Sequence, residues 1–260
     1  MLRKALRKYN GLRQQVDNVL LGDEGDLWEA ELKNFLAKRS CWVTETPKRV
    51  EILEPPEIII PNLRTTGPTL GHWLAAREEL HKFWTGDTIV LRDMFAFTEE
   101  QLARTDVIPV FRPVGATNRL AVDWKKKLGI SVYEEVDVMG YKNSGGPKKP
   151  ELYLINRSVR PDEDTLGEGN KKSPDQLIVV PKKIWAGLYG WCDADSLHFA
   201  ITENHLDPET VTWFPKDRLA DGRVARGDWY GARVYLCWHY SDDCYPRYGA
   251  RATEPVPFRT

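Results

Sequence analysis

The chain has 260 residues, of which 42% are hydrophobic and 29% charged, a composition typical of a globular protein with one large or two small domains. Its 37 basic and 38 acidic residues nearly cancel, so the overall charge does not demand nucleic acid or an acidic membrane as partner. Four cysteines, no apolar run near the roughly 20 residues of a membrane span and no secretory signal predict a soluble, cytoplasmic protein without a disulfide scaffold.

The first 45 residues predict a helical hairpin. From Leu2 to Leu20 apolar residues recur at steps of three and four, the spacing of one stripe along a helix. A second helix is expected over 26–38, with Asp26 as its N-cap and Glu29 three residues later. The stripe would be covered by the body or by a second copy of the chain, which makes a homo-oligomer one expected assembly. The cations among the first thirteen residues leave a nucleic-acid-binding arm or a transit segment as alternatives.

A proline-rich linker is expected over residues 46–68, where three consecutive isoleucines lie among prolines. The remaining residues, 69–260, predict a body in which strands and helices alternate without regular βαβ units. We therefore expect the α+β class with a mainly antiparallel sheet.

Within this body, helices are expected over 69–84, after the cap Thr98, after the cap Thr117 as far as Gly129, and after Pro181. Strands are expected over 88–91, 107–111, 130–141, 152–155, 177–180, 197–202, 211–214 and 233–240. Residues 158–176 form the longest stretch without a structural signal, and loops of that length are commonly functional or disordered.

The segment 233–240 carries the strongest strand signal and lies among aromatic and basic residues. Its alternation predicts that Val234, Leu236 and Trp238 are buried, whereas Arg233, Tyr235, Cys237 and His239 share the opposite face. Tyrosine, tryptophan and arginine together are typical of surfaces that stack on bases and contact phosphates, or of protein interfaces. The predicted binding residues are Arg233, Tyr235, His239, Arg247, Tyr248 and Arg251. The alternative is an aromatic core whose arginines extend to water.

Three kinds of chemistry compete with this binding surface. A structural zinc could use Cys192, Cys237, His239 and Cys244, although their spacing is unlike that of paired zinc ligands and favours free cysteines, so we predict no metal and no cofactor. Alternatively, a thiolate of Cys237 or Cys244 could be activated by His239, with Asp242 or Asp243 orienting the imidazole.

The third chemistry is that of clustered carboxylates. Aspartates with a divalent cation could make the protein a metal-dependent hydrolase or phosphotransferase, and this is the second functional hypothesis. The residues concerned are Asp193, Asp195, Asp242 and Asp243.

Overall fold

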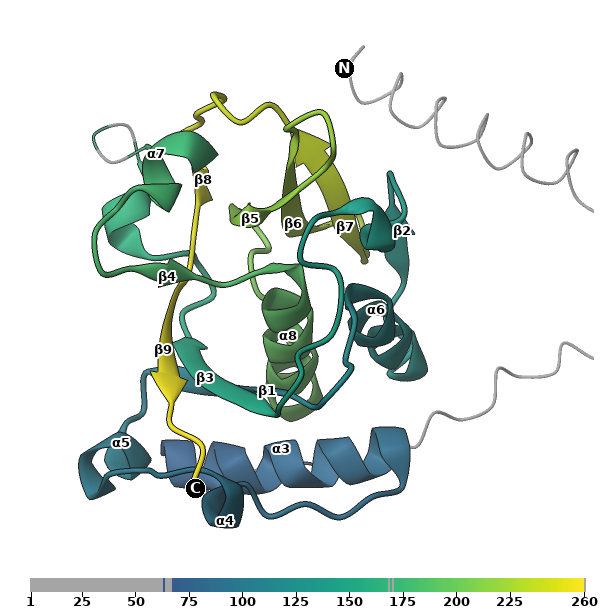
Figure 1. Ribbon diagram of the computed structural model, residues 1–260, viewed down its shortest axis with the longest axis vertical. Coiled ribbons are helices and arrows are strands. Elements are labelled where there is room, and N and C mark those ends of the chain that lie inside the picture. The colour runs from purple at the N-terminus through teal and green to yellow at the C-terminus, as the bar shows by residue number, and fades with distance from the viewer. Residues whose placement is uncertain (1–62, 64–66, 168, 170, 260) are drawn as a thin grey trace, which may run out of the picture. The chain divides into compact units, whose positions relative to one another are not determined.

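The computed structural model describes residue 63 and residues 67–167, 169 and 171–259, and these ranges form the body of the protein (Figure 1). The predicted helical hairpin (1–45) and nearly all of the predicted linker (46–68) lie outside the described residues. The body contains helices and two sheets, which confirms the α+β class.

One sheet has four antiparallel strands and the other has five strands of mixed direction. The four-stranded sheet has the order β1 (Val107–Arg112), β3 (Glu151–Asn156), β9 (Ala252–Val256), β4 (Ile184–Trp185). The five-stranded sheet has the order β2 (Val132–Glu134), β7 (Arg233–His239), β6 (Val224–Tyr230), β5 (Val211–Arg218), β8 (Tyr248–Gly249). Its two edge strands, β2 and β8, pair in parallel with their neighbours, whereas β5, β6 and β7 are antiparallel.

The helices begin where their capping residues predict. The hydroxyl groups of Thr98 and Thr117 accept hydrogen bonds from the backbone of the following helices, and Gly129 has a φ of 75° just after the end of the second. The helical segments are α3 (Leu70–Thr85), α4 (Leu91–Met94), α5 (Glu99–Ala103), α6 (Asn118–Lys127), η1 (Val138–Gly140), η2 (Glu163–Thr165), α7 (Pro174–Ile178) and α8 (Leu188–Thr202). Within the described ranges, no helix combines the length and apolarity that a membrane crossing requires.

Helix α8 lies between the two sheets, and α3 lies along the far side of the four-stranded sheet (Figure 1). Strand β1 shows how alternation builds this layering. Ile108 and Val110 belong to the large core around α8, whereas Val107 and Phe111 pack in a smaller core with α3. The four-stranded sheet is therefore apolar on both faces. A third small core, which includes Trp185, Trp213 and Val224, lies where α7 packs against β5.

The largest correction to the predicted elements concerns residues 197–202, which are not a strand but the second half of α8. The first eleven residues of α8, Leu188 to His198, are all buried, because sheets and helices enclose this helix on every side. A helix buried all round carries no polar face, so its 3.6-residue period is lost and a short chance alternation resembles a strand.

Other predicted strands are also wrong. Residues 130–141 contain only the three-residue strand β2, because the Asp137 carboxylate accepts a hydrogen bond from the Met139 amide and turns the chain into η1. Residues 88–91 lead into α4, where the Glu78 carboxylate accepts a hydrogen bond from the Leu91 amide. Residues 177–180 form the end of α7 and the turn after it, and this helix begins with a capping box at Ser173. The helix expected after Pro181 is instead the short strand β4.

Strand β6 is absent from the predicted elements, yet it joins β5 to β7 in the middle of its sheet. Its central residue is Gly227, where a Cβ atom would lie 3.0 Å from ring carbons of Phe214 and Trp191. The glycine lets the indole of Trp191 on α8 approach the sheet closely, which explains a residue type that weakens strand signals.

Candidate functional site

The register of β6 and β7 decides which side chains share the solvent-facing side of the five-stranded sheet. Tyr230 lies opposite Arg233, Asp228 opposite Tyr235, and Arg226 opposite Cys237. Residues opposite each other in an antiparallel pair point to the same face. We call the set Tyr133, Arg226, Asp228, Tyr230, Arg233 and Tyr235 the outer sheet face.

The other side of β7 faces the core. Val234 and Leu236 are buried there, as their alternation predicted. Trp238 is only half-buried, because it lies near the end of the strand. Its ring is covered by the guanidinium of Arg223, which lies 3.7 Å from the ring centre, and not by the core. Its predicted place in the core is therefore wrong.

Three tyrosines form a cluster on the outer sheet face. The ring of Tyr235 lies 5.0 Å from that of Tyr133 and 5.9 Å from that of Tyr230, and the latter two are 41% and 62% exposed. Tyr133 belongs to β2, which pairs in parallel with β7. The sequence could not associate Tyr133 with this face, because a parallel pairing between distant segments leaves no local pattern.

The charges on this face are only partly compensated. A guanidinium nitrogen of Arg226 lies 2.8 Å from a carboxylate oxygen of Asp228, and the same guanidinium lies 5.6 Å from the ring centre of Tyr248. Arg233 is exposed and forms no ion pair with any residue in the described part of the chain. Among the described residues, the outer sheet face therefore offers a cation without an ion-pair partner beside a cluster of phenol rings.

His239, predicted as a binding residue, belongs to a neighbouring group at the end of β7. Its Nδ1 atom lies 2.9 Å from a carboxylate oxygen of Asp243, and its ring contacts the rings of Tyr245 and Tyr248. Burial raises the pKa of the Cys237 thiol to about 11, so this sulfur is protonated at neutral pH. An imidazole oriented by a carboxylate is thus present, but Cys237 does not supply the thiolate nucleophile that the sequence suggested.

The two remaining arginines in the predicted site differ from each other. Arg247 is exposed and donates a hydrogen bond to the carbonyl of Glu209. Arg251 is fully buried, forms a 2.9 Å ion pair with Asp207 and donates hydrogen bonds to the carbonyls of Asn156 and Ser158. Its predicted place on a binding surface is wrong, because it holds the end of β3 and the Asp207 loop together inside the protein.

The carboxylates and thiols proposed for metal chemistry are not brought together. Asp193 and Asp195 are buried in α8 in ion pairs with Arg77 and Lys125, whereas Asp242 is exposed in the loop after β7. Cys192, Cys237 and Cys244 are free cysteines. Across residues 67–167 and 171–259, no three His, Cys, Asp or Glu side chains are grouped so that they could hold a metal ion.

No known protein family, no curated protein sequence and no solved structure matches this chain.

Proposed function

We propose that the protein binds single-stranded nucleic acid on the outer sheet face. The observation that carries this proposal is the cluster of Tyr133, Tyr230 and Tyr235 on the outer sheet face, next to Arg233, which forms no ion pair with a described residue. Exposed rings on a sheet provide surfaces on which successive bases stack, and a nearby guanidinium contacts the phosphates between them.

The chemistry of the face supports nucleic acid over a protein partner. Protein interfaces are usually built around a central apolar patch. The outer sheet face instead presents phenols, guanidinium groups and a carboxylate, and none of the large aliphatic side chains exposed elsewhere in the described residues lies among its members. The near-zero net charge of the chain limits nonspecific attraction, so stacking would provide most of the affinity. We further propose that the protein acts in the cytoplasm and assembles as a homo-oligomer.

A matched pair of tyrosine variants tests the proposal. Tyr230 and Tyr240 are 62% and 61% exposed, but Tyr240 contacts the ring of Trp238 on the opposite side of β7. Binding of a fluorescent oligothymidine or oligouridine, measured by anisotropy, should weaken about 5-fold to 100-fold in Tyr230→Ala. Tyr240→Ala should bind within about twofold of the unchanged protein, since it removes a similar ring from outside the face.

Salt dependence gives a second measurement. Arg233→Ala should reduce the slope of log affinity against log salt by about one, the loss of a single phosphate contact. The proposal is wrong if neither oligonucleotide binds at low salt, or if both tyrosine variants weaken binding equally. A protein ligand whose affinity falls only in Tyr230→Ala, in the absence of oligonucleotide binding, would identify the face as a protein interface instead.

A further inference from the structure

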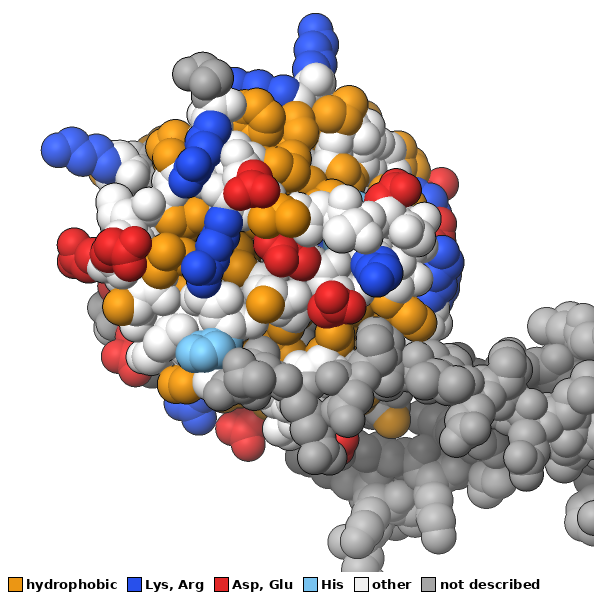
Figure 2. Space-filling model, turned by 90° about the horizontal axis from the view of Figure 1, so that it is seen from below, with side chains coloured by type: hydrophobic (Ala, Val, Ile, Leu, Met, Phe, Trp, Pro, Cys, Tyr) orange, Lys and Arg blue, Asp and Glu red, His pale blue; other side chains and the backbone are white. Residues whose placement is uncertain are grey.

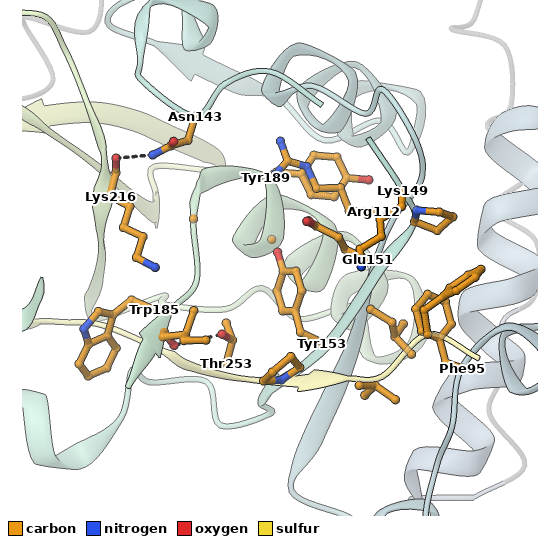
Figure 3. Close-up of a pocket in the computed structure, with 18 of the residues that line it drawn as sticks. Phe95, Arg112, Asn143, Lys149, Glu151, Tyr153, Trp185, Tyr189, Lys216 and Thr253 are labelled. Atoms are coloured by element: carbon orange, nitrogen blue, oxygen red, sulfur yellow. Dashed lines mark hydrogen bonds between the residues drawn. The ribbon is translucent and has the colours of Figure 1, made fainter. Parts of the chain in front are cut away.

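A cavity of about 490 Å³ lies between the two sheets, beside the first turn of α8. Its walls come from β3, β4, β5 and β9, from the loop before β3 and from the segment after β9 (Figure 3). None of its lining residues belongs to the outer sheet face. Whatever the cavity binds is therefore independent of the proposed nucleic-acid site.

Two glycines allow polar groups to approach the first turn of α8 within this cavity. A Cβ atom at Gly187 would lie 2.8 Å from a carboxylate oxygen of Asp217, and one at Gly190 would lie 2.1 Å from the hydroxyl oxygen of Tyr153. No larger residue could occupy Gly190 without displacing the phenol. The helix therefore begins with residues that leave room for Asp217 and Tyr153 at the cavity wall.

Three cations line the cavity, and none forms an ion pair with a described residue. They are Arg112, Lys149 and Lys216. The guanidinium of Arg112 is fixed by hydrogen bonds to the carbonyls of Ala116 and Gly145 and lies 4.9 Å from the ring centre of Tyr189. Figure 3 shows the side chains of Lys216 and Tyr153 directed into the same space. A fixed guanidinium without a carboxylate partner is suited to an anionic ligand.

The fully buried cations of the described body are held differently from Arg112. Arg77, Lys125 and Arg251, the fully buried cations of the described body, each lie within 3.0 Å of an aspartate oxygen. Arg112 is only partly buried, and its guanidinium is held by neutral carbonyl groups and forms no ion pair with a described residue.

The cavity also contains two acidic groups, Asp217 and Glu151, so its three cations leave one positive charge in excess. Asp217 is 4% exposed and accepts the Leu188 amide at 2.5 Å. Burial raises its pKa to about 6, so it loses its proton less readily than an ordinary aspartate. The Tyr153 hydroxyl has no partner within the described residues and can donate a hydrogen bond to a ligand oxygen.

Apolar side chains also line the cavity. Ile184 and Phe258, which are 46% and 42% exposed, lie at its rim, and Trp185 and Pro257 also line it. Exposed aliphatic and aromatic side chains around a polar pocket are typical of sites that enclose a small organic molecule.

We propose that this cavity binds a small phosphate monoester, whose phosphate lies against Arg112, Lys149 and Lys216 and whose apolar body packs on Ile184, Trp185 and Phe258. The excess of positive charge favours an anion, and the oxygens of a phosphate group match the planar donors of a guanidinium. The Tyr153 phenol supplies a further donor at the wall of the cavity.

Phenyl phosphate is the smallest probe that contains both parts of this ligand. Nuclear magnetic resonance titration of the isotopically labelled full chain should show saturable shifts of the Gly187 and Gly190 amides. Inorganic phosphate and phenol should each bind at least about tenfold more weakly than phenyl phosphate, because each lacks one of the two contacts.

Lysine variants give the control. Lys149→Ala with Lys216→Ala removes two exposed cations of the cavity, so the fold should persist and the affinity for phenyl phosphate should fall at least about tenfold. Lys148 is exposed and adjacent to Lys149 in the sequence, but it does not line the cavity. Lys148→Ala should therefore leave the affinity unchanged. The proposal is overturned if phenyl phosphate causes no saturable shift at either glycine. It is also overturned if the double variant and the Lys148→Ala control weaken binding equally.

Discussion

Helix α8 and the outer sheet face use charged residues in opposite ways. In α8, Asp193 and Asp195 have no exposed side-chain surface, and each is held by a cation that is equally buried. On the outer sheet face, the side chains of Arg226 and Asp228 retain 17% and 16% of their exposure, and Arg233 has no partner among the described residues. Charges in the core are confined to fixed pairs, whereas those on the sheet remain available to a ligand.

The largest effect should come from breaking a core pair. Asp193→Asn removes the carboxylate that binds Arg77 through two hydrogen bonds and leaves a buried guanidinium uncompensated. We expect the free energy of unfolding to fall by about 3–5 kcal/mol, measured by urea denaturation. The matched surface change, Asp228→Asn, should lower it by less than about 1 kcal/mol. Equal losses would contradict the distinction between the two regions.

Asp217 represents a third situation, a buried carboxyl that forms no ion pair with any described residue. Its folded-state pKa of about 6 lies above the ordinary value of 3.8, so between these values the folded state binds more protons than the unfolded state. The contribution of Asp217 to the free energy of unfolding should therefore fall as pH rises from about 4 to 6, by about 2–3 kcal/mol in total.

Asp217→Asn provides the measurement of that effect. The amide oxygen of asparagine can still accept the Leu188 amide, but it does not ionise. Relative to the unchanged protein, the variant should gain stability as pH rises through this window in urea denaturation. A difference between the two proteins that is independent of pH would show that Asp217 ionises as an ordinary aspartate.

The two tryptophans near the ends of the five-stranded sheet test burial itself. Trp238→Ala should lower the free energy of unfolding by about 1–2 kcal/mol, because the ring is partly exposed and packs against the side chain of Arg223 near the surface. Trp213→Ala, which truncates a fully buried ring on β5, should lower it by about 3–5 kcal/mol. Thermal or urea unfolding of both variants measures the contrast, and a larger loss at Trp238 would contradict it.

The smallest effect on stability is expected at His239. His239→Ala removes a partly exposed ion pair with Asp243 and a few ring contacts, so the free energy of unfolding should change by less than about 1 kcal/mol. Urea denaturation measures this value, and Trp213→Ala, on β5 of the same sheet, is the buried control. A loss above about 2 kcal/mol would place His239 among the structural residues of the core.

Local signals in the sequence were sufficient for part of this fold. Thr98 and Thr117 mark the starts of α5 and α6, since an N-cap is made by a side chain and a backbone amide only a few residues apart. The alternation around Val234 and Leu236 identifies β7 because one of its faces is buried and the other is not. Each of these features depends on neighbours along the chain.

The elements that only the tertiary structure decided depend on distant residues. Residues 197–202 alternate much as β7 does, yet they are helical because α8 is enclosed by both sheets and needs no polar face. Tyr133 joins the outer sheet face through the parallel pairing of β2 with β7. Arg251, predicted as a binding residue, is instead buried in an ion pair with Asp207. The sequence by itself determined the α+β class, several caps and the strand β7. Which aromatic and charged side chains meet, on the sheet and in the cavity, was decided by long-range packing.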